Sequence, residues 1–244
     1  MSISYKDNNI RIWNINNWEW ILNLININKV GYLLSSCFLN QNNDIFILSS
    51  NNNLNGNSEH IKIFDFNGQK INEINNSNEL TEFIDTYYDN ILSKNYIITG
   101  NFNFSKSYDY ENNKIYHKYN GNNSGRYIKS IIIKNNKGII KLIESCTDGN
   151  IRIFNFHSGL LLNKIIINSP LCGICLWNDN YLFVGCKDKT IKMVEIKNKL
   201  IVKSLNGHNN DISTIKIINP PEYGECLISQ NWEESERKLW VNEI

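Results

Sequence analysis

A Cys-x-x-Cys run, Cys172-Gly173-Ile174-Cys175, is the clearest candidate for chemistry in this 244-residue chain. Two cysteines at this spacing can form a redox pair or one half of a zinc site. The run falls within an expected strand and not at the start of a helix, and no second pair is present to complete a zinc site. We therefore interpret both cysteines as small apolar core residues, and we expect no metal and no cofactor.

The other residue types that serve in catalysis form no known constellation. The four histidines, His60, His117, His157 and His208, are scattered and form neither a His-Glu-x-x-His motif nor a spaced metal cluster. The sequence also has no Gly-x-Ser-x-Gly nucleophile motif, no Walker-type phosphate loop and no Gly-x-Gly-x-x-Gly. We expect that the chain is not an enzyme.

Composition excludes several classes of partner and location. The formal net charge is +1 and the isoelectric point is about 7.6, so no overall field attracts nucleic acid or an anionic membrane. The first 13 residues lack the apolar region of a secretion signal, and no run of about 18 apolar residues suits a membrane span. Six cysteines without a signal indicate reduced thiols, and we expect a cytoplasmic protein.

One five-residue pattern recurs along the chain: isoleucine, a basic residue, an apolar residue, an aromatic anchor and a polar residue. Clear copies occur at residues 10–14, 61–65 and 151–155, and weaker copies complete the series. The anchor positions are Trp13, Phe64, Tyr108, Phe154, Val194 and Trp240. Successive anchors are 51, 44, 46, 40 and 46 residues apart. Steps of roughly 40–50 residues with four strands in each unit are typical of a β-propeller.

Each unit divides into short strands separated by turns rich in Asp, Asn and Gly, which accept positive φ. Around Phe154 the expected strands are residues 127–133, 138–144, 151–156 and 160–167. The sequence therefore predicts an all-β fold, a single propeller over residues 1–244 with about six four-stranded antiparallel blades. The expected blades span roughly residues 1–25, 31–74, 83–119, 127–167, 171–205 and 212–244.

The first and the last of these blades are expected to be incomplete. The first begins with its second strand, and the last ends with its third. An N-terminal segment of about 20–40 residues preceding Met1 would supply both missing strands. A partner that adds strands to the open edges is the alternative.

The repeated units resemble the WD-repeat family over nearly the whole chain. The family's strand-three dipeptide is degenerate here, as in Trp13-Asn14 and Phe64-Asp65, and its Gly-His marker is intact only at Gly207-His208. The acidic residue six positions before the anchor is present as Asp7, Asp148 and Asp188. The resemblance implies a structural network in which this aspartate bonds the histidine, which reaches a strand-two hydroxyl and the strand-three tryptophan.

Most blades lack parts of that network. Cys146 and Cys186 occupy two of the hydroxyl positions, so we expect packing to provide most of the rigidity there. The carboxylates of Asp148 and Asp188 then need backbone N–H partners within their turns.

A basic residue stands two positions before each anchor and could suggest nucleic-acid binding. These residues are Arg11, Lys62, Lys106, Arg152, Lys192 and Lys238. Their recurrence at one blade position spreads the charges around a ring, and acidic residues balance them. We interpret them as solvated or ion-paired strand positions and expect neither a nucleic acid nor a membrane as partner.

The resemblance implies a non-enzymatic scaffold or adaptor that presents a propeller face to a protein or peptide within a larger complex. In the family the residue before the turn aspartate often contacts partners, which indicates Lys6, Thr147 and Lys187. Trp232 in the last blade is the best candidate for an exposed aromatic contact, whereas Trp18 and Trp20 are expected to pack in the core or between blades.

Two alternatives remain open at this point. The chain could be the targeting or substrate-recognition part of a larger kinase or ubiquitin-ligase type of protein. It could also be an enzymatic or small-molecule-binding propeller, whose site would be built from loops that converge at the channel mouth.

Overall fold

A computed structural model describes residues 2–4, 9–14, 16–24, 32–42, 44–52, 60–75, 80–121, 124–135, 137–231 and 237–241. Within these ranges all regular secondary structure is β-strand, which confirms the all-β fold class. The described ranges accordingly hold no helix with the length and hydrophobicity needed to cross a bilayer.

The chain forms two compact units, residues 1–118 and 119–244, of which the first contains three antiparallel sheets. The first sheet has three strands: β1 (Ser2–Ser4), β2 (Asn9–Trp13) and β3 (Trp20–Leu24). The second has four: β4 (Tyr32–Gln41), β5 (Asp44–Asn52), β6 (His60–Phe64) and β7 (Lys70–Asn75). The third also has four: β8 (Phe83–Asp89), β9 (Lys94–Gly100), β10 (Phe104–Asp109) and β11 (Lys114–Asn120).

The second unit repeats this plan. Its first sheet consists of β12 (Tyr127–Lys134), β13 (Ile140–Cys146), β14 (Asn150–Asn155) and β15 (Leu161–Ile166). The next consists of β16 (Leu171–Trp177), β17 (Tyr181–Cys186), β18 (Ile191–Glu195) and β19 (Leu200–Leu205). Three described strands form the last sheet: β20 (Ile212–Ile218), β21 (Cys226–Asn231) and β22 (Arg237–Trp240).

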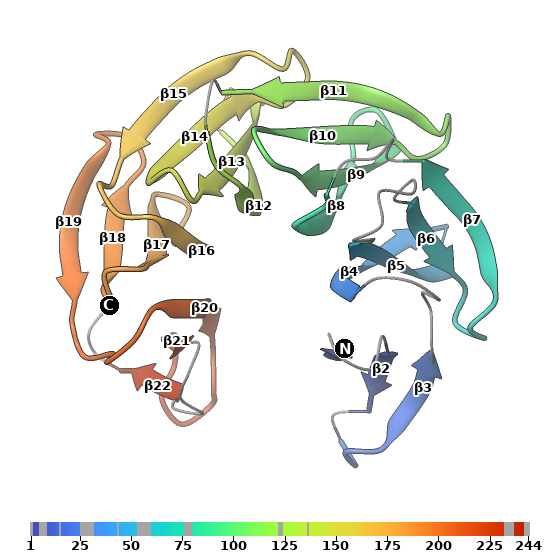
Figure 1. Cartoon of the computed structure of the whole chain (residues 1–244), viewed down its shortest axis with the longest axis horizontal. Coiled ribbons are helices and arrows are strands. Elements are labelled where there is room, and N and C mark those ends of the chain that lie inside the picture. Colours follow the sequence, from blue (N-terminus) through green and yellow to red (C-terminus); the bar gives the residue numbers. More distant parts are fainter. Residues whose placement is uncertain are drawn as a thin grey trace. The chain divides into compact units, whose positions relative to one another are not determined.

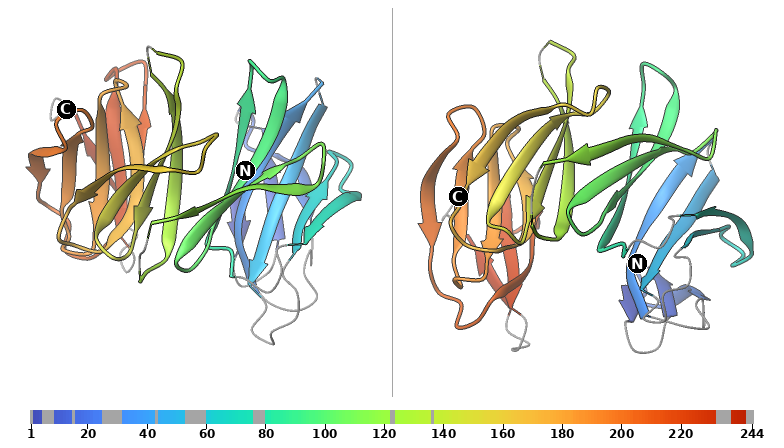
Figure 2. Two further views of the ribbon diagram at one scale, coloured as in Figure 1. Left: turned by 90° about the horizontal axis from the view of Figure 1, so that it is seen from above. Right: turned by 45° about the horizontal axis from the view of Figure 1, so that its top comes forward.

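Within each unit the sheets stack face to face as the blades of a β-propeller. Every sheet is a meander in which strands consecutive in sequence pair side by side (Figure 1). The left view of Figure 2 shows the stacked layers of the second unit, coloured from yellow-green to red. The expected propeller class is therefore confirmed, and three described strands form each of the first and last sheets.

The core lies between neighbouring sheets and consists mainly of isoleucine. Ile143 and Ile153 from one sheet pack with Leu182 and Val194 from the next, and all four are buried. β-Branched side chains suit this position because they fit a pleated surface that is covered on both faces. Burial of these sheet faces fixes the spacing between blades in each unit.

A β-bulge recurs at the anchor of the repeated pattern. The register shifts between the anchor and the preceding residue, where strand three pairs with strand four. The shifts lie at Ile12/Trp13, Ile63/Phe64, Ile153/Phe154 and Met193/Val194. A bulge increases local twist and redirects a side chain, so one local geometry accompanies the repeated sequence in both units.

Asparagine occupies many of the turns. Of the ten described non-glycine residues with positive φ, five are asparagines: Asn42, Asn103, Asn113, Asn168 and Asn178. Asn tolerates the left-handed region better than other residues with a Cβ atom. The Asn-rich composition therefore supports the tight turns of the meanders.

The expectation for Trp18 and Trp20 is wrong. Trp18 lies in the turn before β3 with a φ of 60° and is 76% exposed, and Trp20 is 55% exposed. Trp18 adopts a left-handed conformation in the turn, so Trp18 and Trp20 do not lie two positions apart on one strand as the sequence suggested. Trp20 instead lies against Trp13, with ring centroids 6.2 Å apart, and beneath the Arg11 guanidinium.

Candidate functional site

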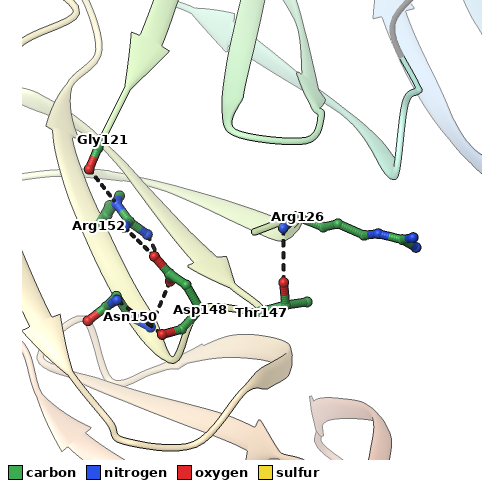
Figure 3. A network of polar contacts seen from close by, with 6 residues as sticks. All are labelled: Gly121, Arg126, Thr147, Asp148, Asn150 and Arg152. Atoms are coloured by element: carbon green, nitrogen blue, oxygen red, sulfur yellow. Dashed lines mark hydrogen bonds and ion pairs between the residues drawn. The ribbon is translucent and has the colours of Figure 1, made fainter. Parts of the chain in front are cut away.

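The turn between β13 and β14 contains a buried ion pair. The Arg152 guanidinium donates to both carboxylate oxygens of Asp148, at 3.1 Å and 2.5 Å (Figure 3). The backbone N–H of Asn150 donates to the same carboxylate at 3.2 Å. Burial tends to raise the pKa of Asp148, but the hydrogen bonds from Arg152 and Asn150 outweigh it and hold this pKa below its ordinary value.

Arg152 also contacts the segment that precedes its own sheet. Its Nε donates to the carbonyl of Gly121, just beyond β11, at 3.2 Å. A Cβ atom on Gly121 would lie 2.1 Å from Cδ of Arg152, so only glycine leaves room for this contact. The Tyr127 ring lies against the guanidinium at 5.8 Å, and the Arg152 side chain is fully buried.

The turn between β17 and β18 repeats the arrangement with a lysine. The Lys192 ammonium lies 2.7 Å from the Asp188 carboxylate and 3.5 Å from the carbonyl of Ile167, just beyond β15. The backbone N–H of Thr190 donates to Asp188 at 3.1 Å, as expected for this turn. This pair is more exposed, because 40% of the Asp188 side chain is accessible to solvent.

The last sheet contains a third version. Lys238 donates to the carbonyl of Gly207, just beyond β19. Nε2 of His208 lies 2.6 Å from Oγ of Ser229 on strand two, and Nε1 of Trp240 on strand three donates to that hydroxyl at 2.7 Å. His208 is buried in the segment between β19 and β20.

The recurrent basic residue thus has a structural role in the second unit. Arg152, Lys192 and Lys238 each donate to a backbone carbonyl in the segment just before their own sheet, at Gly121, Ile167 and Gly207. Arg152 and Lys192 are ion-paired, one of the two outcomes predicted for this position, and these bonds add to the rigidity that packing provides. The sequence contained a signal for the two ion pairs, because an aspartate six positions before the anchor accompanies a basic residue two positions before it.

Thr147 and Lys187, two expected contact residues, lie at the surface of these turns. Thr147 is half-buried, and its hydroxyl accepts from the backbone N–H of Arg126 at 2.9 Å. Lys187 and Lys189 are exposed, as is Arg126, whose side chain points away from the network in Figure 3. We call the surface formed by Arg126, Thr147, Lys187 and Lys189 the turn face.

Ser169 connects the two turns of this face. Its hydroxyl accepts from the backbone N–H of Asp188 at 3.2 Å. Ser169 also packs against Gly149 of the other turn, which has a φ of 81°. A Cβ atom added to Gly149 would lie only 3.1 Å from the Ser169 carbonyl oxygen. The turns at 147–149 and 187–189 therefore adjoin and hold their exposed residues on one surface.

The remaining expected positions fall into two groups. Lys6, Asp7 and Trp232 lie outside the described residues. The anchors Phe64, Tyr108 and Phe154 are buried, while Trp13 and Trp240 are partly exposed. The described part of the face thus belongs to the second unit alone.

Cys172 and Cys175 are half-buried on β16, and the described residues contain no group of side chains that could hold a metal ion. Burial raises the pKa of Cys172 to about 11 and that of Cys175 to about 12. Both thiols are therefore protonated near neutral pH.

We expect Cys172 and Cys175 to react with iodoacetamide at pH 7.5 at least tenfold more slowly in the native protein than in urea. Only the thiolate is nucleophilic, and burial suppresses it. Peptide mass spectrometry measures both rates, and the single serine variants Cys172→Ser and Cys175→Ser assign the signals. Native labelling at the rate of free cysteine would show instead that the pair is activated.

The sequence matches no protein-family model and no curated protein.

Proposed function

We propose that this chain is a non-enzymatic scaffold of the WD-repeat propeller type, and that the turn face binds an acidic segment of a protein partner. The main support for this proposal is that the carboxylates of both turns already form ion pairs within the fold. Asp148 and Asp188 are neutralised by Arg152 and Lys192 within the fold. The turn face carries the exposed cations Arg126, Lys187 and Lys189, whereas the partly exposed Asp188 carboxylate beside them is ion-paired with Lys192.

Rigidity supports a binding role for this face. The turns are held by backbone hydrogen bonds, by the two ion pairs and by Ser169 between them. A surface that is ordered before binding loses less conformational entropy when a partner docks. Exposed cations on such a surface favour encounter with an acidic partner and oppose basic ones. β-Propellers commonly act as interaction scaffolds of this kind.

The test reverses charge on the face at Arg126→Glu and Lys187→Glu together. We expect proteins that co-purify through this face to decrease at least fivefold in quantitative mass spectrometry. The matched control, Lys164→Glu with Lys199→Glu, makes the same change of net charge at exposed positions outside the face. This control should leave the amounts of those co-purified proteins unchanged. An identical set of co-purified proteins from both double variants would refute the assignment of this face.

A further inference from the structure

A cavity of about 610 Å³ opens between the β12–β15 and β16–β19 sheets of the second unit. It lies at the strand ends opposite the turn face, beside the turns that follow β12, β16 and β18. This volume is within the range of small-molecule sites. The cavity is therefore separate from the surface proposed above to bind a protein.

Four lysines line this cavity: Lys134, Lys137, Lys141 and Lys197. Asp179 is the only acidic residue among the described lining residues. Within the described part of the chain, none of the four lysines forms an ion pair. This contrasts with Lys192 at the other end of the same sheet, which has Asp188 as a partner.

Lys134, Lys137 and Lys197 are exposed and Lys141 is half-buried, so water screens much of their mutual repulsion, and the group still attracts anions. The lining carries four positive charges and one negative charge, so its net charge is +3 with the lysines protonated. The ammonium of lysine is a compact point charge and a common ligand of phosphate groups. A chain of phosphates concentrates several negative charges in a small volume, so it matches the +3 charge of the described lining better than a single carboxylate does.

The rest of the lining is apolar or carries neutral amides. Ile153 and Ile196 are buried and Leu176 is half-buried, so they form an apolar wall. Asn163 and Asn180 add amide groups that can donate hydrogen bonds to a ligand. A bare inorganic anion would leave the apolar wall without contact.

We infer that this cavity binds a soluble organic polyphosphate, with its phosphates among the lysines and its organic body against the apolar wall. The inference does not depend on the proposed protein-binding role, because the two sites lie at opposite strand ends and share no residue.

Isothermal titration calorimetry of the full chain tests this with four probes: ATP without Mg²⁺, tripolyphosphate, adenosine and hexaglutamate. We expect ATP to bind with a submillimolar Kd and tripolyphosphate at least threefold more weakly. Adenosine and hexaglutamate should show no binding. The triple variant Lys137→Gln, Lys141→Gln, Lys197→Gln should weaken ATP binding at least tenfold, because it removes three of the four charges.

The control is Lys164→Gln, Lys199→Gln, Lys216→Gln, which removes the same charge at exposed positions outside both the cavity and the turn face. It should change the Kd for ATP less than threefold, and circular dichroism checks that both variants fold. The inference is overturned if ATP fails to bind, if tripolyphosphate or hexaglutamate binds as tightly as ATP, or if the control loses as much affinity as the cavity variant.

Discussion

Asp148→Ala is expected to lower the free energy of unfolding by about 3 kcal/mol, because it leaves a fully buried guanidinium without its partner. Breaking a buried pair by removing one member costs roughly 3–5 kcal/mol. We expect the lower end of this range because a second acidic residue remains near Arg152. Glu144 is buried and lies opposite Arg152 in the β13–β14 ladder. Urea unfolding followed by the fluorescence of Trp177 and Trp240 in the same unit measures the change.

Asp188→Ala is the matched control for this prediction. It removes the equivalent carboxylate in the next blade, where Asp188 is 40% exposed and Lys192 is 14% exposed. Water can solvate Lys192 after the change, so the expected loss is about 0–1 kcal/mol. Equal losses for the two variants would show that burial of Arg152 does not set the strength of the pair.

The same pair determines how the contribution of Asp148 depends on pH. Its pKa lies below the ordinary value of 3.8 in the folded protein, so the ionised form is favoured by folding. The stabilisation is complete well above pH 3.8 and is lost as the pH falls through the native pKa. The difference in stability between the wild-type protein and Asp148→Ala should therefore be constant near neutral pH and shrink in acid.

Phe154→Ala is expected to lower the free energy of unfolding by about 3–5 kcal/mol, the usual cost of emptying a buried aromatic position. Phe154 is fully buried at the bulge of β14, and its ring centroid lies 5.5 Å from that of Tyr119. Alanine at this position would leave a cavity beside the Tyr119 ring, and the tightly packed side chains around it cannot close that cavity. Urea unfolding at neutral pH measures the loss.

Leu161→Ala provides the comparison within the same ladder. Leu161 pairs with Phe154 across β14 and β15 but is 43% exposed. Its truncation should therefore change stability by no more than about 0.5 kcal/mol. A loss as large as that of Phe154→Ala would mean that the repeat anchor has no special place in the core.

The sequence by itself determined the fold class, the repeat and the buried anchors. Alternating β-branched residues and turns of Asp, Asn and Gly act on the backbone within a few residues, and their recurrence at steps of 40–51 residues marks the blades. The meanders and the buried Phe64, Tyr108 and Phe154 follow from those patterns. The sequence also contained both members of each ion pair at constant offsets from the anchor.

Only the tertiary structure decided what those charged residues contact. The carbonyls that accept hydrogen bonds from Arg152, Lys192 and Lys238 lie 31, 25 and 31 residues earlier in the chain. No local pattern brings them together, because each contact joins strand three of a sheet to the segment that enters the sheet 25–31 residues earlier. The lysine-lined cavity likewise combines turns from two sheets. Such sites depend on how separate hairpins stack, and that is set by burial across the whole unit rather than by spacing along the chain.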